Sequence, residues 1–146
     1  MKGLAAPDRL ENCVCLCVRR TARAVTRSYD RGLSEAGLNS SQFAVLAALA
    51  AGAQTMSSLA DHLVMDRTTL TRNLGPLIRS GLVGVRRGRD ARTRVVEITV
   101  NGTRKLKNAL PLWRSAQRMT VAAVGSARYS RLMATLSQIT DRSVRQ

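Results

Sequence analysis

Acidic residues are scarce in this chain of 146 residues. It contains 9 Asp plus Glu against 24 Lys plus Arg, which gives a formal net charge of +15. A large field of one sign favours polyanionic partners. Nucleic acid is therefore the first candidate partner.

Aromatic side chains are also few, at 3% of the residues. The four of them, Tyr29, Phe43, Trp113 and Tyr129, fall in segments that we expect to form the core or a dimer interface. They leave no platform on which unpaired bases could stack. Duplex DNA is thus a better target than single-stranded DNA or RNA.

The chain lacks long apolar runs. The longest, at positions 43–53, is too short to span a bilayer. Positions 1–10 lack the apolar stretch and the small-residue cleavage site of a secretion signal. We therefore expect a cytoplasmic protein with no membrane partner.

Histidine occurs once and cysteine three times. Zinc requires converging ligands, whereas Cys13, Cys15 and Cys17 alternate along a helix and His62 belongs to a distant segment. The odd cysteine count in a reducing compartment argues against a disulfide framework. The chain also lacks paired carboxylates, a Gly-rich phosphate loop and a nucleophile beside a base. We expect no metal, no cofactor and no enzymatic activity.

Helical periodicity, by contrast, runs through most of the chain. The first helix is expected from Leu10 to the region of 32–37. Two shorter helices follow, one capped at Asn39 or Ser40 and ending at Gly52, the other capped at Thr55 and ending near position 64. The inward-facing positions of the first helix are predicted to be Leu10, Cys13, Val14, Cys17, Thr21, Ala24, Val25 and Ser28.

Two further helices are predicted towards the C-terminus. A long one is capped at Thr99 or Asn101, and Pro111 is expected to bend or divide it. The last helix is expected over 126–139. With a β-hairpin between them and the earlier helices, the fold class is mainly α with a small β-hairpin wing, a winged helix-turn-helix.

A helix from Asp66 to Ser80 has the features of a DNA-reading element. A short preceding helix braces it, and its N-terminal half can enter the major groove. Pro76 is expected to kink its second half. The buried positions are predicted as Leu70, Leu74, Leu77 and Ile78, and the exposed ones as Arg67, Thr68, Thr71 and Arg72. Arginine can pair with guanine and threonine can contact phosphate or a thymine methyl, although such residues can also form an ordinary solvated face.

The hairpin that follows has a strongly basic tip. Its strands are expected at 82–85 and 93–98, rich in β-branched residues. A narrow basic hairpin can contact phosphates or a minor groove, and Asp90 could orient Arg92 or Arg94 there. The alternative is a charged edge that only prevents aggregation, but that role needs fewer charges. The candidate DNA-binding residues of the hairpin are Arg86, Arg87, Arg89, Arg92 and Arg94.

These segments together resemble the MarR family of winged-helix transcriptional regulators. The resemblance runs from Leu10 to about Ile139, and its most specific parts are four short stretches in the same order and spacing: 57–63, 66–72, 80–83, and 90–92 running into 98–102. It implies a homodimer built from N- and C-terminal helices, recognition helices in successive major grooves, and wing arginines, Arg92 first, in flanking minor grooves. It also implies an inverted-repeat operator.

The resemblance divides a single domain of 146 residues into functional segments. Residues 39–99 would form the DNA-binding lobe, and residues 8–37 and 100–142 the dimerisation helices. The stretch from Leu10 to Cys15 is also similar to the organic-hydroperoxide-sensing branch of the family, which implies Cys15 as a redox-sensing thiol and Tyr29 as its supporting tyrosine. The alternative for each of the three cysteines is simple packing, since cysteine is often buried.

The sequence thus predicts a sequence-specific duplex-binding regulator, and we expect a repressor. A small-molecule effector or thiol oxidation would change its affinity for the operator. The alternative is a non-specific architectural DNA-binding protein that uses charge alone.

Overall fold

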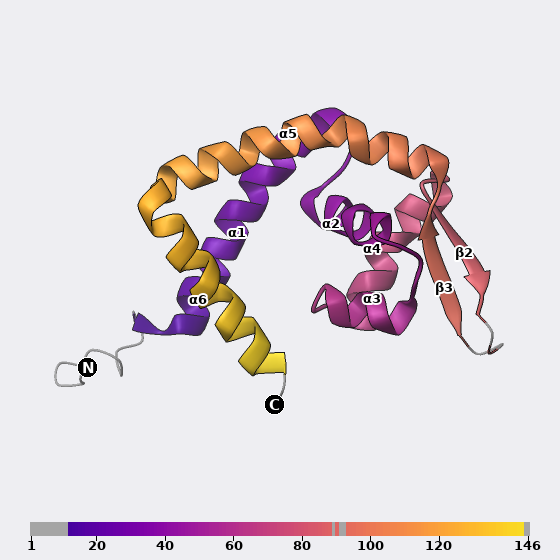
Figure 1. The fold of residues 1–146 in the computed structure, drawn as a ribbon, viewed down its shortest axis with the longest axis horizontal. Helices are drawn as coiled ribbons and strands as arrows, with labels where there is room; N and C mark the ends of the chain where they lie inside the picture. The colour runs from indigo at the N-terminus through magenta and orange to yellow at the C-terminus, as the bar shows by residue number, and fades with distance from the viewer. Residues whose placement is uncertain (1–11, 89, 91–92, 145–146) are drawn as a thin grey trace.

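The computed structural model describes residues 12–88, 90 and 93–144 of the chain. In Figure 1, α5 spans the molecule, with α1 and α6 under one half and the remaining helices and strands under the other. The elements, in chain order, are α1 (Val14–Leu33), the 3-10 turn η3 (Ser34–Ala36), α2 (Ser40–Ala50), β1 (Gln54–Thr55), α3 (Met56–His62), α4 (Arg67–Arg79), β2 (Val83–Arg87), β3 (Arg94–Ile98), α5 (Val100–Val124) and α6 (Ser126–Val144).

Four helices begin at the capping residues that the sequence predicts. Asn39, Thr55, Asp66 and Thr99 each accept a hydrogen bond from the backbone amide three residues later, which satisfies an amide that has no partner within the helix. Where the sequence left two candidates, the structure selects Asn39 over Ser40 and Thr99 over Asn101. Asn39 also forms a complete capping box with Gln42.

The sheet has three antiparallel strands in the order β1-β3-β2. The predicted hairpin is confirmed as β2 and β3, whose register pairs Val83 with Ile98 and Arg87 with Arg94. Strand β1 was not predicted, because two residues are too few to show an alternating pattern. It pairs Gln54 with Val96 and so attaches the hairpin to the segment before α3.

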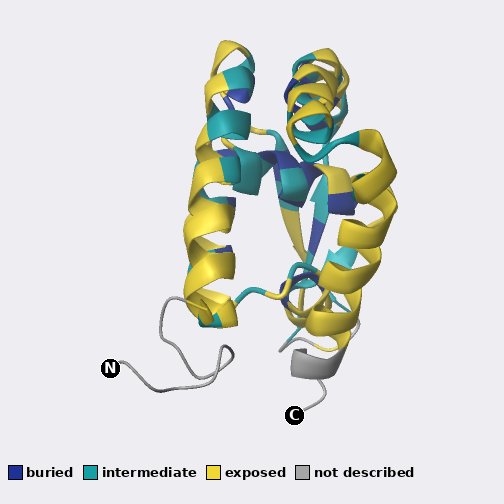
Figure 2. Cartoon of the chain, turned by 90° about the vertical axis from the view of Figure 1, so that its left-hand side faces the viewer, coloured by how far each residue is buried: buried dark blue, intermediate teal, exposed yellow. Residues whose placement is uncertain are grey.

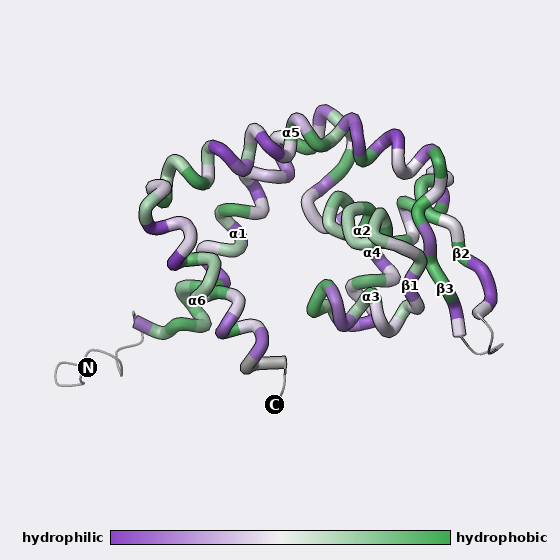
Figure 3. The backbone as a smooth tube through the Cα atoms, in the orientation of Figure 1, coloured by the Kyte–Doolittle hydropathy of each residue, from purple (hydrophilic) through white to green (hydrophobic). Residues whose placement is uncertain are grey.

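The hydrophobic core lies between α2 and the elements around it. Figure 3 shows α2 as a largely hydrophobic segment in the middle of its half of the molecule. Phe43 of α2 stacks on Trp113 of α5, with ring centroids 5.9 Å apart and ring planes at 11°. The fully buried large side chains are Leu33, Val45, Leu46, Leu49, Leu59, Leu70, Leu74, Leu77 and Val96.

The predicted inward face of α1 is only partly correct. Cys13, Val25 and Ser28 are half-buried, but Val14, Cys17, Thr21 and Ala24 are exposed in the single chain. Leu10 lies outside the described residues. Only the C-terminal half of α1 packs closely in the chain itself, where Leu33 is buried and Tyr29 packs against the core. Figure 2 shows the result as long exposed surfaces on α1 and α6.

Pro111 does not divide its helix and Pro76 does not end its helix, whereas Ile78 departs from expectation. Helix α5 continues through Pro111 without division, and Figure 1 shows it as one curved helix. Helix α4 likewise continues through Pro76 to Arg79. Ile78 is 40% exposed instead of buried, because Leu74 and Leu77 already fill the contact with the core near the end of α4.

Candidate DNA-binding surface

Helices α3 and α4 form a compact helix-turn-helix unit. Leu59 and Ala60 of α3 and Leu70 of α4 are buried in the core, and the amide of Met65 donates to the carbonyl of Ala60 at 2.9 Å to tighten the turn. Val64 adopts a φ of 51° at this turn. That conformation is unfavourable for a β-branched residue, so the tertiary contacts on both sides must hold it.

The four predicted DNA-reading residues of α4 all lie on its exposed surface. Arg67, Thr68, Thr71 and Arg72 are each exposed, while Leu70 and Leu74 point into the core. Two of the four have local partners: Arg67 Nη2 donates to Ser57 Oγ of α3 at 3.0 Å, and Thr71 Oγ1 donates to the carbonyl of Arg67 at 2.7 Å. Arg67 thus links α4 to α3. The sequence alone did not indicate its hydrogen bond with Ser57.

The N-terminus of α4 is held by a charged cap. Asp66 Oδ1 accepts from the amide of Thr69 at 2.8 Å, and Oδ2 accepts from the Thr69 hydroxyl at 2.7 Å. These two hydrogen bonds, the backbone one first, favour the ionised carboxylate and lower the pKa of Asp66 from its ordinary value of 3.8. The cap therefore fixes the first turn of α4 at neutral pH.

The basic hairpin lies on the surface, and its arginines differ in their surroundings. Arg87 and Arg94 are both exposed and directly opposite each other across the two strands. Arg86 instead forms a salt bridge with Glu97, with Nε 3.3 Å from Oε2. The sequence prediction missed this pairing, although the hairpin register could have shown it. Arg86 is therefore less available to a phosphate than Arg87 or Arg94.

The end of the hairpin is closed by backbone hydrogen bonds. The amide of Gly88 donates to the carbonyl of Thr93 at 2.8 Å, and the amide of Thr93 donates to the carbonyl of Asp90 at 2.9 Å. Asp90 is exposed. Arg89 and Arg92 lie outside the described residues, so the role predicted for Asp90 as an orienting group towards Arg92 or Arg94 stays a prediction.

An open groove of about 470 Å³ runs along α1. It is lined by Cys17, Arg20, Thr21, Arg23, Ala24 and Arg27. Three of these lining residues are arginines and three are small, and α1 has no acidic residue before Asp30. This arrangement favours an anionic occupant.

The redox candidates on α1 lie far apart. Cys13, Cys15 and Cys17 form no disulfide with one another, and Cys15 is exposed. Tyr29 lies fourteen residues further along the same helix, about 21 Å away at 1.5 Å per residue. Its hydroxyl donates to Gln117 Oε1 of α5, and Gln117 Nε2 donates to the hydroxyl of Tyr129 of α6 at 2.9 Å. The structure does not bring Cys15 and Tyr29 together within one chain.

Among the residues that the structure describes, no helix combines the length and the apolar content that a membrane span requires.

A braced helix with an exposed polar face, flanked by a basic antiparallel hairpin, defines the winged-helix class of DNA-binding proteins. The comparison with family models agrees, since residues 36–93 match the MarR family. A search of curated proteins finds no match. The solved structures extend the likeness over nearly the whole chain.

The chain is 42% identical to the M. tuberculosis transcriptional regulator MosR crystallised with DNA, with a TM-score of 0.78 over 90% of this chain and 98% of MosR. A second structure of M. tuberculosis MosR gives 38% identity and the same TM-score, over 92% and 99% of the two chains. BpsR of Bordetella bronchiseptica, whose DNA binding is regulated by 6-hydroxynicotinic acid, has the same fold at 20% identity, with a TM-score of 0.82 over 93% and 99%.

The chain belongs to the MarR family and is a DNA-binding transcriptional regulator, not an enzyme.

Proposed function

We propose that this regulator binds an inverted-repeat operator as a homodimer and represses transcription there. Residues 39–99 supply the DNA-binding lobe, and residues 8–37 and 100–142 supply the dimer contacts. In each lobe, Arg67, Thr68, Thr71 and Arg72 of α4 face the major groove. The observation that carries the proposal is that α4, which has this exposed polar face, contacts strand β2 of the basic hairpin.

The hairpin contributes phosphate or minor-groove contacts. Like charges directly opposite on two strands destabilise a hairpin, so the exposed pair Arg87 and Arg94 costs folding stability. A DNA phosphate placed between the two guanidinium groups offsets that repulsion and accepts charge-assisted hydrogen bonds from them. From the sequence, Arg89 and Arg92 add to the same contact, and Asp90 orients Arg92 or Arg94. Arg86 contributes less because Glu97 already pairs with it.

The homodimer is supported by apolar side chains that the single chain leaves exposed. Val14 is 62% exposed on α1, and Leu132, Met133, Leu136 and Ile139 are exposed on α6. Helix α6 has only one side chain, Tyr129, that is even half-buried among those the structure describes. A helix with such an uncovered apolar face requires a partner surface.

The operator affinity responds to an effector, for which two inputs are proposed. The arginine-lined groove on α1 supports a small anionic ligand, a chemistry shared with the acid that regulates BpsR. Oxidation of Cys15 is the other input, with Tyr29 of a second copy as the supporting residue. Within one chain Tyr29 is too distant and bonds to Gln117.

Binding to duplexes selected from a random pool tests the proposal. Arg72→Ala should lose about 1–3 kcal/mol of preference for the selected operator over random duplex, because a base contact is removed. Arg94→Ala should weaken binding to both duplexes equally, because a phosphate contact is removed. The slope of log affinity against log salt concentration should become smaller by about 1. Fluorescence anisotropy across a salt series measures both quantities, and Arg19→Ala on exposed α1 is the matched control.

The alternative, an architectural binder, gives a different result in the same titration. If wild type binds the selected operator no more tightly than random duplex at physiological salt, the sequence-specific function is wrong. The redox input is tested by treating wild type and Cys15→Ser with a thiol-specific oxidant and then repeating the titration with both proteins. Unchanged operator affinity of the oxidised wild type excludes it.

A further inference from the structure

The longest helix carries a row of cations that the proposed function does not use. Helix α5 has five basic residues and no acidic residue. Four of the five, Arg104, Lys107, Arg114 and Arg118, are exposed. We call these four the α5 ridge.

The four residues share one face of the helix. Their spacing of three, seven and four residues returns to the same side at 3.6 residues per turn. The buried residues of α5, which include Gly102, Leu106, Ala109 and Ala116, lie on the opposite side. The ridge therefore points away from the core, and it extends about 21 Å from Arg104 to Arg118 at 1.5 Å per residue.

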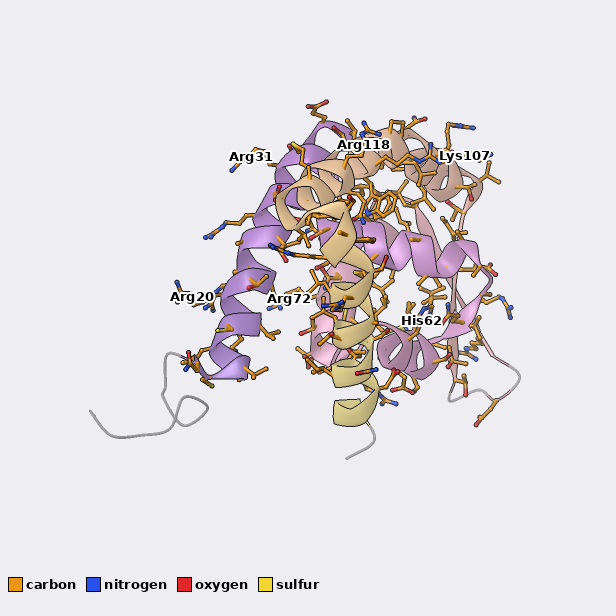
Figure 4. All side chains as sticks on the ribbon, turned by 60° about the vertical axis from the view of Figure 1, so that its left-hand side comes forward. Arg20, Arg31, His62, Arg72, Lys107 and Arg118 are labelled. Atoms are coloured by element: carbon orange, nitrogen blue, oxygen red, sulfur yellow. The ribbon has the colours of Figure 1, made fainter. Side chains whose placement is uncertain are left out.

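The ridge is also remote from the operator-reading surface. Figure 1 shows α5 on the side of the molecule opposite to α3 and the free end of the hairpin. Figure 4 shows Lys107 and Arg118 at the top of the molecule, well away from Arg72 and His62. A duplex on α4 and the hairpin would leave the ridge open to solvent.

In the described part of the chain, no acidic side chain forms an ion pair with the ridge. The salt bridge found there joins Arg86 and Glu97, which lie on the hairpin. The neutral residues between the cations, Asn108, Pro111 and Ser115, are small or polar and exposed. A protein interface usually centres on large apolar or aromatic anchors. A phosphate backbone needs only cations, so the ridge suits DNA better than an acidic protein.

We propose that the α5 ridge binds the backbone of a second DNA duplex, so that one regulator bridges two DNA segments. The ridge spans about six base pairs at roughly 3.4 Å each, and its contacts are independent of sequence. The two-fold symmetry of the proposed dimer would present two ridges. The bridging rests on the proposed function in one respect: the first duplex is the one bound by α4 and the hairpin.

A capture assay tests the bridge. Operator duplex is immobilised and saturated with wild-type protein, and a labelled random duplex is then added across a salt series. Wild type should capture the second duplex. Lys107→Gln/Arg114→Gln should lose most of the capture, and its salt slope should fall by about 2, one for each phosphate contact removed. The control Arg19→Gln/Arg131→Gln removes the same charge from exposed positions on α1 and α6 and should keep the capture.

The outcomes separate the bridge from the primary binding. Binding of the first duplex without capture of a second by wild type overturns the bridge and leaves the proposed function intact. Failure to bind the first duplex contradicts the proposed function itself. Equal losses in the ridge and control variants overturn the bridge, because net charge alone then explains capture. Capture of labelled polyglutamate but not of duplex overturns it as well and assigns the ridge to an acidic protein.

Discussion

At the scale of single residues, Asp66 determines where α4 begins. Its carboxylate accepts two hydrogen bonds from Thr69 and so sets the first turn of α4. The next residue, Arg67, reaches back to Ser57 and holds the brace helix. The direction in which Arg72 points depends on this short chain of contacts, because a shifted helix start would rotate every exposed side chain of α4.

The lowered pKa of Asp66 predicts a pH-dependent contribution to stability. Since the folded state favours the carboxylate, the contribution is present above the ordinary pKa of 3.8 and is lost as the pH falls through the folded value. Asp66→Asn keeps a capping oxygen but no charge. We expect wild type to be the more stable protein at pH 7, with the difference vanishing in acid. Urea unfolding at a series of pH values measures it.

A suitable control for this comparison is Asp61→Asn, which removes the same charge from an exposed position on α3 that caps no helix. If Asp66→Asn and wild type give parallel stability profiles between pH 7 and pH 3, the cap does not depend on charge.

At the scale of elements, the hairpin and α5 meet in a close junction. Thr99 caps α5 through the amide of Gly102 and also donates to the carbonyl of Gly81 at 2.7 Å. Gly102 is buried, and a Cβ at that position would lie 2.1 Å from the carbonyl oxygen of Leu82 and 2.8 Å from Ile98 Cγ1. Only glycine lets α5 begin so close to β2, which couples the wing to the long helix.

Gly102→Ala should therefore destabilise the protein by about 1–3 kcal/mol or more, because the backbone of Leu82 cannot move as a flexible side chain would. Gly32→Ala on α1 is the matched comparison: its Cβ would lie 3.7 Å from Ala116 Cβ, an ordinary contact. Alanine in a helix gains about 0.5–1 kcal/mol over glycine there. Thermal and urea unfolding compare the two variants, and similar stabilities would show that the junction can relax.

At the scale of the whole molecule, charge and apolar surface are distributed on different faces. Among the described residues no charged or polar side chain is buried, so the excess of cations lies at the surface. Figure 2 shows that α1 and α6 are largely exposed along their length. The single chain thus folds around α2 but leaves two helices that a second copy can cover.

Leu132→Asp/Leu136→Asp should convert the proposed dimer to a monomer. Each buried leucine contributes about 1.5–3 kcal/mol, so the dimer dissociation constant should rise at least about a hundredfold. Sedimentation velocity measures the change, and circular dichroism checks that the chain stays folded. Ala134→Asp, on another side of the same exposed helix, should leave the dimer intact. A dimer that survives the double substitution would show that α6 does not form the interface.

Much of the fold follows from local chemistry that is visible in the sequence. The caps at Asn39, Thr55, Asp66 and Thr99 and the buried leucines of α4 depend on residues only a few positions apart, so their periodicity and side-chain chemistry were sufficient. The exposed set on α4 follows from the same periodicity. These elements define the DNA-binding lobe before any tertiary contact is known.

Other features depend on contacts between distant segments, and only the tertiary structure decided them. Strand β1 exists because Gln54 meets Val96, Arg86 is paired because the hairpin register brings Glu97 beside it, and Tyr29 bonds to Gln117 eighty-eight residues away. The exposed N-terminal half of α1 has the same origin, since a helix pattern specifies an apolar face but not the element that covers it. Local spacing determines which residues share a face, and the fold determines what each face meets.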